Sequence, residues 1–193
     1  MDPEKNKILE LVAHAQAGDE FSMGELFERY HQAIYRFHAY RVGSAEDAED
    51  LTQTTFLEMV RSLPQYHPRA GISFSSWLFS IARYRLIDYY RRHANNIPFD
   101  KVSPDEYTRM QSDTTNPDYD SRIPMIRRQM RQLPENYQTI LQLTLLEGLN
   151  LREAAHAMKI SSLHARVLKH RAIKKLKSLM PEYSFNYEQT DQP

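Results

Sequence analysis

Residues 44–63 read SAEDAEDLTQTTFLEMVRSL and carry one uninterrupted helical repeat. Apolar or small residues recur every three or four positions, which is the spacing of one face of an α-helix. These positions are Ala48, Leu51, Thr55, Met59 and Val60. Ser44 with Asp47 three positions later resembles a capping box, the arrangement that starts a helix, with the aspartate as a shorter stand-in for glutamate. We therefore expect an amphipathic helix here, with Asp47, Asp50, Thr54 and Glu58 on its outer face.

The rest of the chain favours the same class of structure. It has only 5 glycines, and its 10 prolines leave long proline-free windows at 4–63, 69–97 and 135–180. Proline breaks helix interiors and glycine weakens them, so helices can run uninterrupted in these windows. Segments that alternate polar and β-branched residues between hairpin turns are missing. The sequence predicts an all-α fold.

The region 93–124 differs from its flanks, because it contains Pro98, Pro104, Pro117 and Pro124 and loses its apolar periodicity. Such composition is typical of a linker. We expect an N-terminal domain at 1–93, a flexible linker at 94–124, a C-terminal domain at 125–180 and a polar, disordered tail at 181–193. A short helix within the linker is the alternative there.

The C-terminal domain is predicted to contain a helix-turn-helix motif. After a helix over about 135–147, Gly148 suits a left-handed turn. Asn150 with Glu153 is a capping pattern for a short helix ending near Lys159. Ser161 then caps a longer basic helix with an apolar stripe. Two helices joined by a tight turn, the second longer and basic, form such a motif.

Composition excludes several classes of protein. The chain has no cysteine, which rules out disulfides, thiol nucleophiles and cysteine-ligated metals. Its 8 histidines form no HExxH motif or compact cluster, so we expect neither a metal nor a cofactor. No apolar run approaches the length of a membrane span, and the charged first ten residues do not suit a secretory signal. We expect a soluble, cytoplasmic protein without membrane insertion.

The formal net charge is +0, yet the charges are segregated along the chain. Residues 148–180 contain eight Lys and Arg against one acidic residue, and residues 83–92 contain four Arg against one Asp. Residues 44–63 carry five acidic residues and one Arg. Basic segments suit nucleic-acid backbones, whereas the acidic helix would repel DNA and suit a basic protein partner. Charged residues that merely solvate helix faces are the simpler alternative.

Four motifs in this order carry a family resemblance. Residues 47–56 read DAEDLTQTTF, residues 74–83 read FSSWLFSIAR, residues 88–92 read DYYRR, and Leu133-Pro134 is followed by GLNLREAA at 148–155. Together they resemble the extracytoplasmic-function (ECF) sigma factors, two-domain proteins that direct bacterial RNA polymerase to promoters. The resemblance covers about residues 26–179. It implies core RNA polymerase and promoter DNA as partners, an anti-sigma factor as a further partner, and no catalysis by the chain itself.

The resemblance also assigns the N-terminal site residues. Those for polymerase binding are Asp47, Asp50, Gln53 and Phe56, although the carboxylates could simply stabilise a helix N-terminus. Those for the -10 element are Ser73, Ser76, Trp77, Arg83, Tyr84, Arg85, Arg91 and Arg92. Extruded bases need aromatic faces and small polar groups, and the arginines suit phosphates. Trp77 falls on the apolar stripe, which favours a place in the core over base stacking, and Tyr84 stands where many relatives have Asn.

In the C-terminal domain, the basic helix after Ser161 would enter the major groove at the -35 element. The expected DNA-binding residues are Arg152, Ser161, Ser162, His164, Arg166, Lys169, His170 and Arg171. The order Leu168-Lys169 reverses the Arg-Leu order usual in the family. The basic group is therefore moved round the helix, and the family's rules for -35 sequence are not expected to hold.

Three other readings compete with this one. An ordinary helix-turn-helix regulator would explain residues 133–180 but not the acidic helix or the segment around Trp77. An enzyme lacks support, since the sequence has no G-x-S-x-G elbow and no glycine-rich phosphate loop. A degenerate sigma-like protein would bind polymerase without initiating transcription, and the altered recognition helix keeps that reading open.

Overall fold

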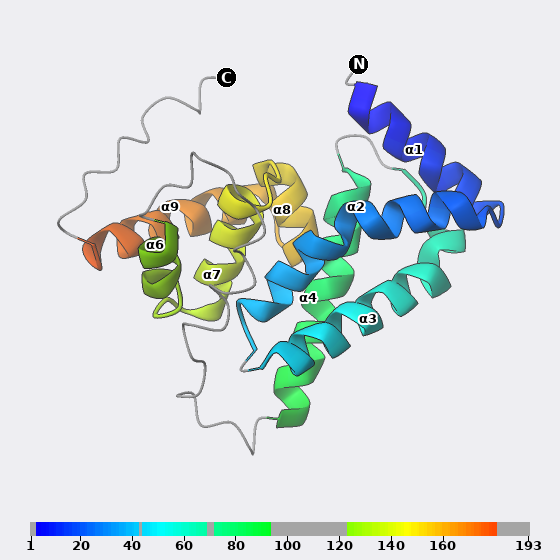
Figure 1. The fold of residues 1–193 in the computed structure, drawn as a ribbon. Helices are drawn as coiled ribbons and strands as arrows, with labels where there is room; N and C mark the ends of the chain where they lie inside the picture. Colours follow the sequence, from blue (N-terminus) through cyan, green and yellow to red (C-terminus); the bar gives the residue numbers. More distant parts are fainter. Residues whose placement is uncertain (1–2, 43, 69–71, 94–122, 181–193) are drawn as a thin grey trace.

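The computed structural model describes residues 3–42, 44–68, 72–93 and 123–180, and these residues form helices and short connections. The all-α prediction is confirmed (Figure 1). The N-terminal part contains α1 (Pro3–Gln16), α2 (Glu20–Ala39), α3 (Ala45–Ser62), a short 3-10 turn (Leu63–Gln65) and α4 (Phe74–His93). The C-terminal part contains α6 (Ile123–Met130), α7 (Glu135–Leu141), a π-helical turn (Gln142–Leu146), α8 (Leu151–Met158) and α9 (Ser162–Ser178). The predicted tail and most of the predicted linker lie outside the described residues.

Side-chain caps explain where α2 and α3 begin. Asp19 accepts a hydrogen bond from the backbone of Ser22, and this cap starts α2 at Glu20. At α3, Ser44 accepts a hydrogen bond from the backbone of Asp47, as the sequence predicts. The Asp47 carboxylate accepts a 2.8 Å hydrogen bond from the Ser44 hydroxyl. The side chain of Asp47 therefore bonds the hydroxyl of the capping serine. In a full capping box, the side chain at this position accepts a hydrogen bond from the backbone N–H of the capping residue instead.

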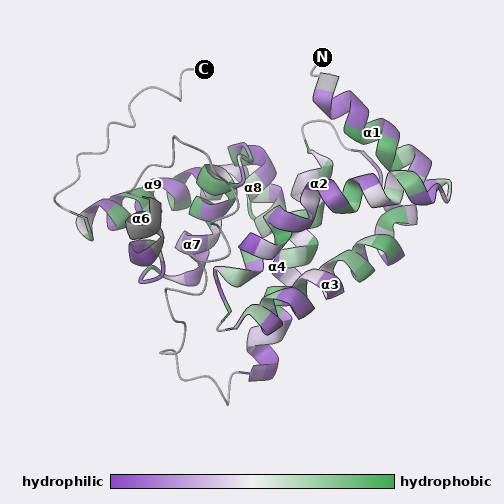
Figure 2. Cartoon of the chain, in the orientation of Figure 1, coloured by the Kyte–Doolittle hydropathy of each residue, from purple (hydrophilic) through white to green (hydrophobic). Residues whose placement is uncertain are grey.

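The helices of the N-terminal part carry both hydrophobic and hydrophilic residues (Figure 2), and each buries some of its hydrophobic side chains. α2 packs against α1 and α3, and α3 packs against α4. Four of the five stripe positions predicted for α3 are buried, namely Ala48, Leu51, Thr55 and Met59. The prediction that Val60 faces the core is wrong, because its side chain is 46% exposed. Val60 follows the buried Met59 directly, and the helical repeat turns its side chain away from the core. Phe56 is buried instead.

The helix-turn-helix prediction is confirmed in detail. Asn150 and Glu153 form a complete capping box at the start of α8. Gly148 has φ +68°, the left-handed conformation that its lack of a side chain permits. Ser161 accepts a hydrogen bond from the backbone of His164 and starts α9. One difference is that the helix expected over 135–147 is α-helical only to Leu141 and continues as a π-helical turn.

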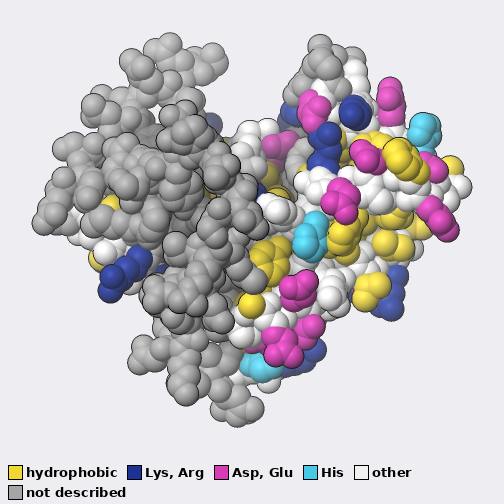
Figure 3. Space-filling view, viewed as in Figure 1, with side chains coloured by type: hydrophobic (Ala, Val, Ile, Leu, Met, Phe, Trp, Pro, Cys, Tyr) yellow, Lys and Arg dark blue, Asp and Glu magenta, His cyan; other side chains and the backbone are white. Residues whose placement is uncertain are grey.

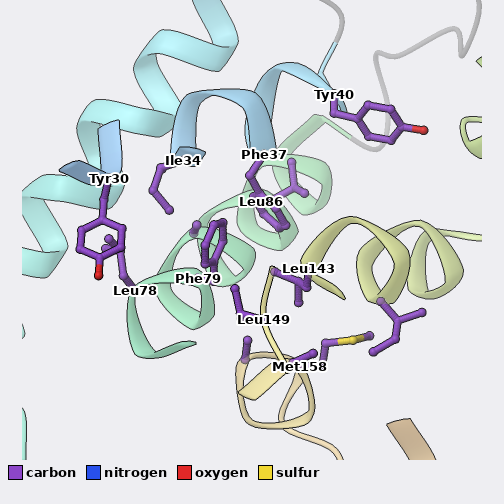
Figure 4. Close-up of a cluster of buried hydrophobic side chains, with 14 of the residues drawn as sticks. Tyr30, Ile34, Phe37, Tyr40, Leu78, Phe79, Leu86, Leu143, Leu149 and Met158 are labelled. Carbon is purple, nitrogen blue, oxygen red and sulfur yellow. The ribbon is translucent and has the colours of Figure 1, made fainter. Parts of the chain in front are cut away.

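The N- and C-terminal parts share one cluster of buried side chains. α8 packs along α4, and Figure 4 shows Leu143 and Leu149 beside Phe79, whose ring meets Phe37 edge-on at 5.6 Å between centroids. Met158 belongs to the same cluster. The two parts of the chain are therefore packed on each other in this structure.

Candidate functional site

The outer face of α3 presents some of the predicted polymerase-binding residues but not all. Asp50 and Gln53 are exposed. Asp47 is half-buried, and its Oδ2 accepts a 3.0 Å hydrogen bond from the Tyr89 hydroxyl of α4 as well as the bond from Ser44. Phe56 is only 5% exposed, so it stands in the core in this structure and cannot present its ring to a partner. Of the four residues predicted to bind polymerase, Asp50 and Gln53 are the two with exposed side chains.

Exposed apolar residues on α2 and α3 were missed by the sequence analysis. Phe27, Leu57 and Val60 are 38%, 59% and 46% exposed. The ring of Phe27 lies 4.7 Å from that of Phe56, so the exposed apolar surface is continuous with the core. Figure 3 shows hydrophobic and acidic side chains side by side on this part of the molecule. Such a mixed surface suits a protein partner, because apolar contact supplies affinity and charge supplies orientation.

At the start of α4, the predicted -10 residues have different surroundings. Ser73 is half-buried, and its hydroxyl accepts a 3.2 Å bond from the backbone of Ser76. Trp77 is half-buried against the rings of Tyr66 and Phe74, with centroids 4.7 Å and 5.4 Å away. These contacts agree with a place for Trp77 in the core.

Ser76, which the family resemblance assigns to the -10 surface, does not lie at the surface in this structure. It is 0% exposed, and its hydroxyl donates a 2.7 Å hydrogen bond to the backbone carbonyl of Glu153 on α8. Since the hydroxyl has one hydrogen, Nδ1 of His156, 3.1 Å away, is placed to donate to it. DNA cannot reach Ser76 while the two parts of the chain are packed in this way.

The second half of α4 offers a smaller basic surface than its sequence suggests. Tyr84, Arg91 and Arg92 are exposed. Arg85 is half-buried and forms an ion pair of 2.9 Å with Glu58 of α3. Arg83 is half-buried, and its Nε is buried without a hydrogen-bond partner within the described structure.

The basic helix α9 presents its cations to solvent. Exposed side chains of the predicted -35 set are Arg152, Ser161, Ser162, His164, Arg166, His170 and Arg171, whereas Lys169 is half-buried. Within α9 there is no acidic residue. Ser161 uses its hydroxyl as the helix cap, so its contribution is to place the helix N-terminus. Leu163 and Val167, 71% and 41% exposed, share this surface and were missed because a single apolar residue carries no pattern.

Two ionisable residues at the end of α2 were also missed. His38 is 0% exposed, and burial, with a smaller effect from the Arg41 charge, lowers its pKa to about 3. Burial lowers the pKa of Arg41 as well. Its Nη1 donates to Oγ1 of Thr139 at 3.2 Å and its Nη2 donates to Oε1 of Gln142 at 3.1 Å. These residues come together only in the folded chain, and no local sequence pattern predicts their contact.

The described residues offer neither a metal site nor a membrane span. In 3–42, 44–68, 72–93 and 123–180, no three His, Asp or Glu side chains are grouped so that they could hold a metal ion. Among the helices described, none is both long and apolar enough to cross a membrane. The arrangement presents surfaces for macromolecules: an acidic and apolar face on α2 and α3, and a basic face on α9.

Family models match both parts of the chain. The model of sigma-70 region 2 matches residues 26–96, and the model of sigma-70 region 4 matches residues 130–178. Among solved structures, that of CnrH in complex with the cytosolic domain of CnrY has a TM-score of 0.67 at 22% identity. It covers 90% of this chain and 97% of the other. At that identity the likeness shows a shared fold.

Curated relatives extend over both parts of the chain. The ECF RNA polymerase sigma factor SigM of Bacillus subtilis is 31% identical over 160 residues, which cover 82% of this chain and 94% of the relative. BldN of Streptomyces coelicolor, an ECF RNA polymerase sigma factor, is 29% identical over 184 residues, which cover 94% of this chain and 69% of the relative. Both helical units and the identity to SigM point to one family: the chain belongs to the ECF RNA polymerase sigma factors, which act in transcription initiation and are not enzymes.

Proposed function

We propose that this chain binds core RNA polymerase in the cytoplasm through the exposed face of α2 and α3. The observation that carries the proposal is the acidic and apolar surface around Asp50 and Gln53, next to Leu57 and Val60. A basic partner helix would pair with the carboxylate while the apolar side chains lose contact with water. Asp47 and Phe56 support this surface from below through their contacts with Tyr89 and Phe27.

Promoter recognition is divided between the two parts of the chain in this proposal. Residues 1–93 would bind the -10 element, residues 125–180 the -35 element, and residues 94–124 would connect them, with 181–193 as a tail. α9 would lie in the major groove at the -35 element with Arg166 and its neighbours on base edges and phosphates. The exposed Tyr84, Arg91 and Arg92 of α4 would hold the strand near the -10 element.

An anti-sigma factor is the third proposed partner. The similar structures support it, because CnrH is seen with the cytosolic domain of CnrY, and the RpoE of Bartonella quintana with the anti-sigma factor NepR. Such a partner would cover the surfaces that polymerase and DNA need. The acidic face of α2 and α3 gives a basic or amphipathic segment of that partner a place to bind.

In vitro transcription tests the proposal and separates it from a protein that binds polymerase without initiating. Sigma-free core polymerase is given a pool of bacterial promoter fragments, with or without the chain, and transcript starts are mapped. We expect discrete starts that depend on the chain and share two upstream sequence elements. If the chain binds polymerase but no transcript start depends on it, the result would instead support a degenerate sigma-like protein that does not initiate transcription.

A further inference from the structure

We infer that α9 recognises thymine methyl groups in the -35 element through two apolar side chains, Leu163 and Val167. Neither residue belongs to the DNA-binding set that the family resemblance gives. The inference rests on the proposed function, because it takes α9 to lie in the major groove. It deepens that function by naming the chemical group on the bases that this chain selects.

Leu163 and Val167 are open to solvent on the outer face of α9. They are the two most exposed large apolar residues among those that the structure describes in 126–180. Because they are four positions apart in one helix, their side chains are neighbours on the same face. The opposite face is buried and includes Ala165 and Ala172. The core therefore takes the other side of α9 and leaves this apolar pair to water or to a partner.

Basic side chains flank the apolar pair on both sides. At about 100° of rotation per residue, Arg166 lies about 60° to one side of Leu163 and Arg171 about 80° to the other. Both arginines are exposed, and α9 contains no acidic residue. His170 and Lys174, also exposed, continue the line of the pair toward the end of the helix. The outer face of α9 thus has an apolar centre with cations around it.

The major groove of duplex DNA has the matching arrangement. Phosphates line both of its rims, base edges form its floor, and it is wide enough to admit an α-helix. The floor presents one methyl group, the C5-methyl of thymine, and an aliphatic side chain can contact it. Leucine and valine side chains form no hydrogen bonds, so the methyl is the feature of a base edge that they can distinguish. With the flanking arginines toward the rims, Leu163 and Val167 would lie over the floor.

The spacing and the charge of this face both suit DNA. Four residues advance the helix by about 6 Å, and base pairs of one strand follow each other at about 3.4 Å. Leu163 and Val167 would therefore meet thymines one or two base pairs apart. A protein could also cover an apolar pair, but cations on both flanks and the absence of acidic residues in α9 favour a polyanion.

Replacement of thymine by deoxyuridine tests the inference, because it removes the C5-methyl group and nothing else. The probe is a fluorescent promoter duplex from a transcription start mapped as described above, bound by the chain together with core polymerase. Each thymine of the -35 element, on either strand, is replaced in turn. At one or two positions, the affinity of the unmodified chain should fall about fourfold, as expected for one methyl group that is buried on binding.

Two variants assign the effect to the side chains. Leu163→Ala and Val167→Ala should each abolish the effect of deoxyuridine at one of these positions. Both residues are exposed, so the fold should be retained, which circular dichroism checks. Leu9→Ala is the matched control, because it makes the same change on an exposed leucine of α1 and should leave the deoxyuridine effects unchanged. Arg171→Ala should weaken binding of both duplexes by the same factor, since a phosphate contact does not distinguish them.

Three results would overturn the inference while leaving the proposed function in place. One is that deoxyuridine has no effect at any thymine, or has equal effects in the unmodified chain and in both variants. Another is a shared -35 element made only of G·C pairs. The third is that Leu163→Ala or Val167→Ala loses polymerase binding without DNA, which would assign the pair to a protein contact. Absence of any chain-dependent start would instead refute the proposed function, and thymine recognition with it.

Discussion

The hydroxyl of Ser76 donates a 2.7 Å hydrogen bond to the backbone carbonyl of Glu153, which lies 77 positions later in the chain. This bond connects α4 to the first turn of α8 and removes Ser76 from solvent. The same serine lies in the motif that resembles the -10 binding segment of ECF sigma factors. In this structure the Ser76 hydroxyl is bonded within the chain and is not exposed to a partner.

Reversing the charge of Asp50 should weaken polymerase binding. Asp50 is exposed on α3, so Asp50→Lys leaves the core intact while placing a like charge against a basic partner. We expect affinity for core polymerase to fall about tenfold, which is roughly 1.4 kcal/mol. Glu49→Lys is the control, because it makes the same charge change about 100° round the helix. Equal affinity of Asp50→Lys and the unmodified chain would exclude this face from docking.

Arg166→Ala should reduce transcription that depends on the -35 element more than it reduces polymerase binding. Arg166 is exposed near the N-terminal end of α9, where recognition helices contact base edges. Loss of one such contact weakens DNA binding by about 1–3 kcal/mol. Lys175→Ala, at the other end of the helix, should have a smaller effect on transcription. A parallel loss of transcription and polymerase binding in Arg166→Ala would mean that α9 is not the recognition helix.

Tyr89→Phe should lower the free energy of unfolding by about 1 kcal/mol, because it deletes the hydrogen bond to Asp47. Burial, and then the bond to Asp47, raise the pKa of Tyr89 to about 12, so its hydroxyl stays protonated and able to donate at neutral pH. Tyr84→Phe changes the same chemical group on an exposed residue and should have little effect. Chemical denaturation measures both, and equal stability of the two variants would show that the bond to Asp47 contributes nothing.

His38 should make stability fall as the pH drops below about 6.5. Its pKa is about 3 in the folded chain and about 6.5 when unfolded, so the unfolded state binds the extra proton between these values. Stability should decrease by about 1 kcal/mol from pH 6.5 to 5.5 on this account. In His38→Gln this part of the pH dependence should vanish. An identical pH profile in both proteins would show that His38 does not titrate on unfolding.

The helices and their caps were predictable because they depend on neighbours in sequence. Asn150 with Glu153 and the left-handed Gly148 follow from local bonding rules, and the structure has both. Val60 was misplaced because a stripe predicts a face only to within one residue. The π-helical turn after Leu141 had no recognisable signal.

The site was less predictable because burial of a polar residue depends on distant parts of the chain. Ser76 and Arg41 meet partners 77 and about a hundred positions away. Periodicity within α4 shows that Ser76 is near the core face, but it cannot show that α8 covers it. The family motifs identified which segments matter, and only the packed structure shows which of their side chains are open.

Binding to core RNA polymerase tests the central claim most directly. The purified chain is mixed with sigma-free bacterial core polymerase without DNA and separated by gel filtration at sub-micromolar concentration. We expect the two to elute together as a one-to-one complex, with Asp50→Lys shifted toward the free chain. Failure of the unmodified chain to elute with polymerase, together with sequence-specific binding of free duplex DNA, would contradict the account.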